Sequence, residues 1–191
     1  MKLLWLDLET TGLHPRTDDI LEVAVGEADL RDPFNLGILH SWVLPISDYQ
    51  LTRLDPVVRD MHTGNGLLDV CAKSTLKLRD LELSLCTLFP PSGGPYVLAG
   101  ASVHFDHDFL KGHMPHFASL LSHKHYDVSA IKLFAQSLGM PKGPKAEAHR
   151  AAADVLASVE EAHTVADWFS ARRHEIKKLM LAQLAKRNET P

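Results

Sequence analysis

Two carboxylates stand two residues apart in the run D-L-E-T-T-G-L at residues 7–13. The segment 3–8 is short and apolar and is closed by a Thr-Gly turn, which predicts a buried β-strand. Side chains alternate along a strand, so Asp7 and Glu9 would point to the same face. Two such acids repel each other unless a cation lies between them, and oxygen ligands suit Mg²⁺ or Mn²⁺. For a bare Asp-x-Glu spacing, two solvated acids on an edge strand are the more frequent outcome.

Two later segments carry acids and a histidine that could join this pair. Asp106 lies in the segment 100–110 and precedes a Phe-Leu pair, while His149 and Asp154 form a His-x4-Asp pattern. Each segment is weak evidence alone, because the chain has 12 His and 24 Asp and Glu residues. Asp106 could instead be a helix N-cap, and His149 could be a solvated histidine at the start of a helix. The order of the three segments gives them weight.

In this order, the three segments resemble the motifs of the DEDDh 3′→5′ exonucleases, which have a ribonuclease-H-like fold. The resemblance implies an α/β fold with a mixed five-stranded sheet flanked by helices. It selects Asp106 over Asp108 as the middle acid, because the Phe-Leu pair then follows at the family spacing. The implied metal ligands are Asp7, Glu9, Asp106 and Asp154, and His149 completes the catalytic set.

Phosphodiester hydrolysis requires an activated water and stabilisation of developing negative charge, which two divalent ions about 3.5–4 Å apart can provide. We expect Asp7 to bridge two Mg²⁺ or Mn²⁺ ions, with Glu9 and Asp154 completing the site that carries the attacking water. Asp106 would act on the outer shell of the second ion. His149 is the expected general base, because histidine commonly accepts protons near neutral pH.

The elements that must position these residues follow from hydrophobic periodicity and turn signals. Strands followed by alternating helices and strands predict an α/β sandwich around a mixed sheet. Strands are expected at residues 3–8, 20–28, 36–44 and 96–100, with a strand end at 125–128. Helices are expected at residues 74–89, from the Asp106 segment onward, at 129–138 with Gly139 after its end, and at 150–169.

The last of these helices constrains the closing motif. At about 100° per residue, His149 and Asp154 would lie about 140° apart if both were helical. His149 is therefore expected in the loop or the first turn, after a mobile Pro/Gly loop at residues 140–145. The expected apolar stripe of the helix is Val155, Val159, Ala162, Ala166 and Phe169.

Length and composition limit the class of protein. A chain of 191 residues with 45% hydrophobic content can form one well-buried domain. We expect an exonuclease domain at residues 1–170 and a basic helical extension at 171–191, where six Lys and Arg face two acids. The net charge of −4 argues against binding long nucleic acid through a broad basic face. Two Cys residues, no signal peptide and no membrane span predict a cytoplasmic protein.

Within the superfamily, the chain most resembles the oligoribonucleases over most of residues 2–170. The segments 62–67 (H-T-G-N-G-L), 100–102 (G-A-S) and 126–129 (Y-D-V-S) carry this resemblance. It implies a homodimer that degrades very short single-stranded oligonucleotides, especially dinucleotides. Leu13 would lie between the two bases, and other residues would bind the substrate. The implied substrate-binding set is Thr10, Gly12, Leu13, His62, Ser102, Lys124 and Ser129.

Three positions depart from the oligoribonuclease pattern. Val57 replaces a base-stacking aromatic residue, Lys124 replaces a phosphate-binding Arg, and Ala101 replaces an Asn. Lys is a point charge rather than a bidentate fork, so the dinucleotide preference and the choice of RNA or DNA stay open. An exonuclease acting on longer single-stranded DNA or RNA is the alternative. A binding module without catalysis is disfavoured because all five catalytic residue types are present.

Overall fold

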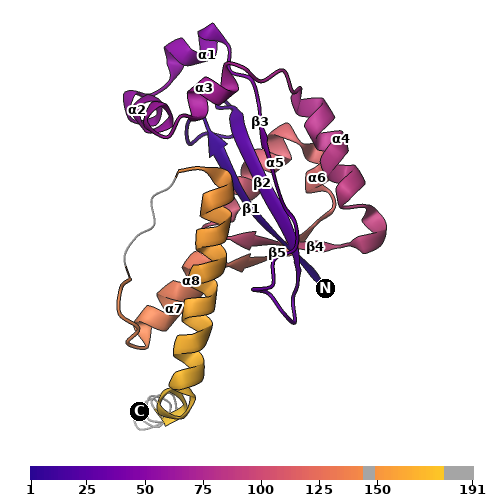
Figure 1. Cartoon of the computed structure of the whole chain (residues 1–191). Coiled ribbons are helices and arrows are strands. Elements are labelled where there is room, and N and C mark those ends of the chain that lie inside the picture. Colours follow the sequence, from indigo (N-terminus) through magenta and orange to yellow (C-terminus); the bar gives the residue numbers. More distant parts are fainter. Residues whose placement is uncertain (144–148, 179–191) are drawn as a thin grey trace, which may run out of the picture.

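The computed structural model describes residues 1–143 and 149–178 of the chain (Figure 1). Its centre is a five-stranded sheet in the order β3-β2-β1-β4-β5. β1 pairs antiparallel with β2 and parallel with β4, so the sheet is mixed, as predicted. The strands are β1 Lys2–Thr10, β2 Ile20–Asp29, β3 Leu39–Val43, β4 Tyr96–Gly100 and β5 Leu121–Asp127.

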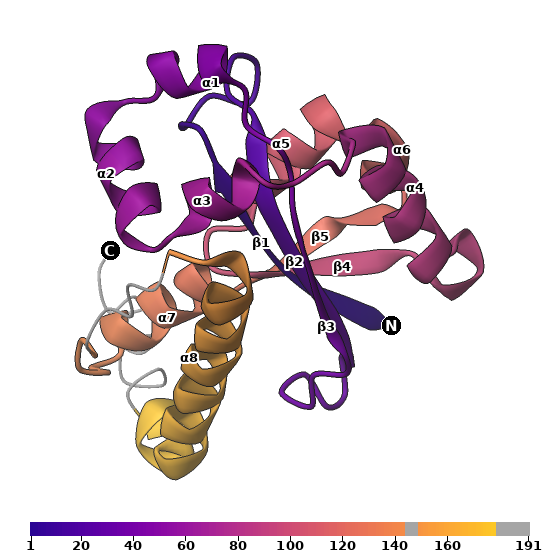
Figure 2. The ribbon, with the colours of Figure 1, turned by 45° about the horizontal axis from the view of Figure 1, so that its top comes forward.

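Helices cover both faces of the sheet (Figures 1 and 2). They are α1 Asp48–Arg53, α2 Pro56–Gly64, α3 Leu67–Cys71, α4 Leu78–Leu88, α5 His104–His113, α6 Pro115–Ala118, α7 Val128–Ser137 and α8 Ala151–Ala171, with a short 3₁₀ helix, η1, at Pro91–Gly93. Leu4, Leu6 and Leu8 of β1 pack with α4, α5 and α6 on one face. Leu3 and Trp5 pack with α7 and α8 on the other face. β1 is thus apolar on both sides, as a strand at the centre of a sandwich must be.

Most predicted elements are present, with shifted ends. β3 begins at Leu39 rather than at residue 36, and α4 begins at Leu78 rather than at 74. Gly139 follows α7 with a φ of +99°, as expected for the residue after a helix end. The helices α1, α2, α3 and α6 were not predicted, because they are short.

The predicted apolar stripe of α8 is wrong in its second half. Val159, Ala166 and Phe169 are only partly buried, whereas Ser158, Val165 and Trp168 are buried. The reason is a change of partner along the helix. Its first turns pack on the sheet, but Val165 and Trp168 form a separate cluster with Ala135 of α7.

The ends of two predicted segments lie outside the described residues. Residues 144–148 include part of the predicted Pro/Gly loop, and residues 179–191 include most of the predicted basic extension. Residues 173–178 are helical. In the part of the chain that the structure describes, no helix has the length and apolar character needed to cross a membrane.

Candidate active site

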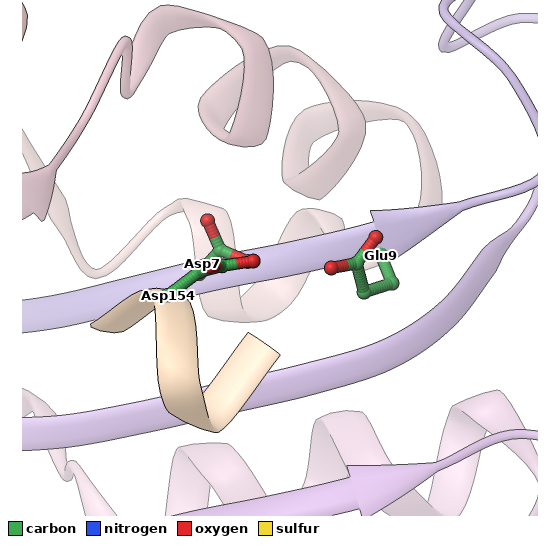
Figure 3. Close-up of side chains that lie close together, drawn as sticks. All are labelled: Asp7, Glu9 and Asp154. Carbon is green, nitrogen blue, oxygen red and sulfur yellow. The ribbon is translucent and has the colours of Figure 1, made fainter. Parts of the chain in front are cut away.

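Three carboxylates converge at the end of the central strand (Figure 3). Asp7 and Glu9 point to the same side of β1 because they are two residues apart. Asp154 reaches them from the first turn of α8, which packs on that face of the sheet. Each residue offers one oxygen atom, and these oxygens lie within 4.8 Å of one another. Such an all-oxygen set is the donor chemistry that Mg²⁺ and Mn²⁺ prefer.

The electrostatics of this cluster favour a bound cation. Burial raises the pKa of Asp7 well above its usual range, and the charges of Asp106, Glu9 and Asp154 raise it further. The pKa of Glu9 is raised to about 8, first by burial and then by the charge of Asp154. A divalent ion would restore the ionised form of these acids. The donor set and the repulsion within it therefore fit a divalent metal site.

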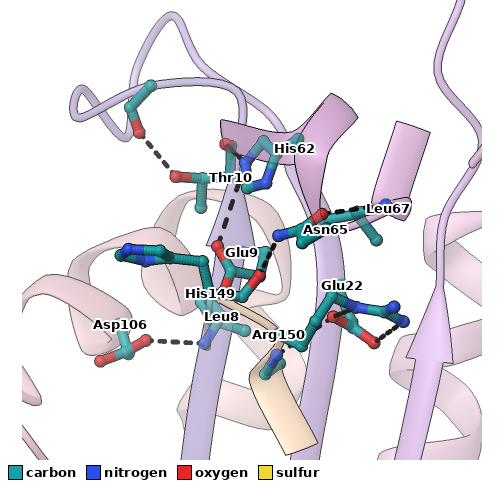
Figure 4. A network of polar contacts seen from close by, with 12 residues as sticks. Leu8, Glu9, Thr10, Glu22, His62, Asn65, Leu67, Asp106, His149 and Arg150 are labelled. Carbon is teal, nitrogen blue, oxygen red and sulfur yellow. Dashed lines mark hydrogen bonds and ion pairs between the residues drawn. The ribbon is translucent and has the colours of Figure 1, made fainter. Parts of the chain in front are cut away.

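Asp106 lies beside this cluster and is held by β1 itself. β4 pairs with β1 only as far as Trp5 and Ala99, so the strand edge beyond is open. There the Leu8 amide donates a hydrogen bond of 3.0 Å to Oδ1 of Asp106 (Figure 4). Burial raises the pKa of Asp106 to about 8, against the effect of its backbone hydrogen bonds. Asp106 is not a helix N-cap, because that position of α5 is Val103.

The neighbouring acid Asp108 has a different environment. Its side chain is about half exposed and forms an ion pair of 2.6 Å with Lys111 on the same helix. Its pKa is lowered, mainly by the hydrogen bond from Lys111. Asp108 thus behaves as a solvated surface acid, whereas Asp106 faces the central strand.

His149 precedes α8, as the angle argument required, because the helix begins at Ala151 with Arg150 at its N-cap. His149, Asp7 and Asp154 line one cavity of about 610 Å³, a size typical of small-ligand sites. Ser102 and Ser129 line it too, and their hydroxyl oxygens are 3.1 Å apart. The cavity therefore joins four of the predicted catalytic or substrate-binding segments.

A buried acid that sequence reasoning missed lies directly opposite Glu9. Glu22 of β2 faces Glu9 in the sheet register and is 2% exposed. Its carboxylate accepts hydrogen bonds from Nε and Nη2 of Arg150, each at 3.0 Å, and from the Ala151 amide at 3.1 Å (Figure 4). Two like charges opposite each other across strands are unfavourable, and the guanidinium fork compensates them. A charged residue within the otherwise apolar run at residues 20–25 was the available signal.

The predicted role of His62 in substrate binding needs correction. His62 is completely buried, and its Nε2 donates to the Thr10 carbonyl at 3.0 Å. Burial lowers its pKa, so the ring stays neutral. His62 therefore holds the end of β1 in place rather than facing a substrate.

The structure explains why Thr10 and Gly12 stand in the turn after β1. Thr10 is buried and its hydroxyl donates to the Gly12 carbonyl at 2.6 Å. A Cβ atom at Gly12 would lie 2.5 Å from Oδ2 of Asp18, so a larger residue would displace the Asp18 carboxylate, which accepts the His14 amide. The turn leaves Leu13 74% exposed. Lys124, in contrast, is an exposed residue of β5 and does not line the cavity of its own chain.

Comparison with known proteins agrees with this arrangement. The family model described as "Exonuclease" matches residues 4–162. The oligoribonuclease of Corynebacterium diphtheriae is 34% identical over 169 residues, covering 84% of this chain and 79% of the relative. The oligoribonuclease of Mycobacterium tuberculosis is 34% identical over 173 residues, covering 84% and 77%.

The fold is also similar to that of solved exonuclease structures. E. coli exonuclease I in complex with a dT13 oligonucleotide aligns with a TM-score of 0.65 and 17% identity. The alignment covers 94% of this chain but only 43% of that protein. This chain thus spans less than half the length of the solved relative, and the likeness is one of fold.

The raised carboxyl pKa values predict how the stability of the metal-free protein depends on pH. The native state keeps protons on Glu9 and Asp106 up to a pKa of about 8, whereas the unfolded chain loses them near pH 4. The free energy of unfolding in EDTA should therefore fall as the pH rises from about 5 to 8. Urea unfolding at several pH values would measure this fall, and Glu9→Gln should make it shallower. An equal slope in both proteins would contradict the assigned environment of Glu9.

Proposed function

The chain belongs to the exonuclease family, among its oligoribonuclease-like members, and we propose that it releases 5′-mononucleotides from the 3′ ends of short oligonucleotides. The observation that carries the proposal is the convergence of Asp7, Glu9 and Asp154, because Asp7 and Asp154 line the same cavity as His149. Such a constellation suits hydrolysis of a phosphodiester. We also propose a cytoplasmic location, which fits the free thiols of Cys71 and Cys86.

The proposed cofactors are two divalent ions, Mg²⁺ or Mn²⁺. Asp7, Glu9 and Asp154 would hold them, and Asp106, bonded to the Leu8 amide, would add its negative charge nearby. When bound, such ions activate water and stabilise negative charge on the phosphate. The protein contributes acids whose positions are fixed by a central strand and by the first turn of α8.

His149 is the proposed general base. Its imidazole lines the cavity beside Asp7 and Asp154, so it can accept a proton from the attacking water. His62, the other histidine close to the carboxylates, cannot take this role. Its Nε2 lies 3.9 Å from Oε2 of Glu9 but is committed to the Thr10 carbonyl.

The second phosphate of a short substrate would bind beyond the carboxylates. Only a hydroxyl-terminated nucleotide lies on the 3′ side of the scissile bond, so a second phosphate must come from the 5′ side. We assign this phosphate to the part of the cavity that is lined by Ser102, Ser129 and Lys132. Lys132 stands three residues after Ser129 on α7, so both lie on one face of the helix. Among the described residues that line the cavity, Lys132 is the one Lys or Arg.

Lys132 therefore replaces Lys124 as the proposed phosphate-binding cation within one chain. Its ammonium group is paired with Glu161 of α8, which also lines the cavity. An ammonium has three donors, so the pair leaves donors for a phosphate oxygen. We also propose a homodimer, on the basis of the resemblance to the oligoribonucleases.

Substrate length is the direct test of the proposed function. Purified protein with Mn²⁺ should be given 5′-labelled RNA and DNA of two to twenty nucleotides. We expect dinucleotides to be cleaved to mononucleotides and the rate to fall with length. Asp7→Asn should abolish turnover because the metal set loses a charge, whereas Asp108→Asn, at a solvated surface acid, should retain it. Faster degradation of the twenty-nucleotide strand would instead support the longer-strand alternative.

Replacement of the general base should affect turnover more than binding. His149→Ala should lower kcat by roughly 10²–10⁴-fold with little change in KM. His174→Ala, at an exposed position, serves as the control. Steady-state kinetics on a dinucleotide would measure both constants. A kcat equal to that of the parent would remove His149 from the reaction.

The role of Lys132 can be separated from that of a structural ion pair. Lys132→Met should raise KM for a 5′-phosphorylated dinucleotide by roughly tenfold, the usual scale for one charge-assisted hydrogen bond. It should change KM little when the 5′ end is a hydroxyl. Glu161→Gln should act in the opposite direction, because it releases the ammonium. A raised KM for the 5′-phosphorylated dinucleotide in both Lys132→Met and Glu161→Gln would contradict this assignment. So would a raised KM in Lys124→Met alone.

A further inference from the structure

His149 has a backbone conformation that must be held from outside. Its φ is +48°, in the left-handed region, which residues with a Cβ atom disfavour. Its carbonyl and the two residues that follow it make the contacts that can restrain this conformation. An unrestrained residue would leave this conformation, and the imidazole would leave its place in the cavity.

Two side chains, Asn65 and Glu22, hold the backbone at residues 149–151 (Figure 4). Nδ2 of Asn65 donates a hydrogen bond to the His149 carbonyl. The next residue, Arg150, is fixed by its two hydrogen bonds to Glu22, and the Ala151 amide binds the same carboxylate. In Figure 4 the imidazole of His149 extends away from Asn65 and Arg150.

Asn65 is itself fixed in orientation. Its Oδ1 accepts a hydrogen bond of 3.0 Å from the Leu67 amide, so its NH₂ group must face the opposite side, toward His149. The backbone of Asn65 ends α2, with its amide bonded to the Met61 carbonyl at 3.1 Å. The left-handed Gly66, with a φ of +75°, then turns the chain so that Leu67 can reach Oδ1. Both ends of the amide are thereby engaged.

We propose that Asn65, together with the Glu22–Arg150 pair, positions His149 by holding its backbone in the left-handed conformation that directs the imidazole into the cavity. This proposal rests on the proposed function, in which His149 is the general base. Asn65 and Arg150 are positioning residues, because Asn65 binds the His149 carbonyl and Arg150 anchors the next position to Glu22, and neither lines the cavity. The segment 62–67 acquires a common role, since His62 holds the end of β1 and Asn65 holds the start of α8.

The test is a double-mutant cycle between Asn65 and His149. Asn65→Asp keeps the acceptor for Leu67 but loses the donor to His149. It should lower kcat on a dinucleotide roughly 5–30-fold, the preference of a residue with a Cβ atom for other conformations, without changing KM. In a His149→Ala background the same substitution should have no further effect, because the group that it positions is gone. Asn35→Asp, at an exposed loop amide, is the matched control.

The outcomes separate this proposal from a purely structural role and from the proposed function. Equal losses in the His149 and His149→Ala backgrounds would mean that Asn65 acts through the fold, and would overturn the proposal. Hydrolysis by the parent protein establishes the function independently of these variants. If Asn65→Asp does not fold, judged by circular dichroism, Arg150→Lys gives the same cycle, because it keeps the charge but loses the fork. An undiminished kcat in the folded variant would also overturn the proposal.

Discussion

Repulsion among buried acids at the end of β1 is the constraint on which the rest of this structure depends. β1 pairs with β2 along its whole length and with β4 as far as Trp5, and both of its faces are covered, so Asp7 and Glu9 lose much of their hydration when the sheet forms. The raised pKa values of both acids express this cost. The two apolar cores on either side of the sheet must offset it, which explains why the strand is otherwise uninterrupted in its apolar character. Asp7 and Glu9 are thus held in position by β1, which lies between the two apolar cores.

The two opposed glutamates of β1 and β2 show two ways of treating a buried charge. Glu22 has a guanidinium fork and a backbone amide, so its charge is compensated within the chain. Within the described part of the chain, Glu9 receives no guanidinium fork and no backbone amide, and the nearby His62 donates its Nε2 hydrogen bond to the Thr10 carbonyl. The carboxyl group of Glu9 lies instead beside those of Asp7 and Asp154, where a divalent cation would compensate all three. Arg150 also fixes the start of α8, and with it the position of Asp154.

Local patterns in the sequence were enough to predict the strands of the sheet and the shared face of Asp7 and Glu9. Apolar periodicity and the i, i+2 spacing both depend only on residues that are close in the sequence. The family pattern singled out Asp106, and the structure buries it while exposing Asp108. The partnership of Glu22 and Arg150 could not be read, since 128 residues separate the two. The burial of His62 depends likewise on short helices that apolar periodicity does not reveal. For α1, the first of them, the Ser47–Gln50 capping box was nevertheless a recognisable signal.

Substrate and metal binding must be coupled in such a site. The described lining of the cavity includes Asp7, Asp154, Glu160 and Glu161, against the single ammonium of Lys132. An anionic oligonucleotide is repelled by this wall until cations neutralise the carboxylates, so each ligand raises the affinity of the other. Additional phosphates would extend along a protein whose net charge is −4, where they gain little attraction. A preference for short substrates therefore follows from electrostatics as well as from the size of the cavity. The positive charge of Lys132 and of bound cations is confined to the cavity, so phosphates outside it gain little.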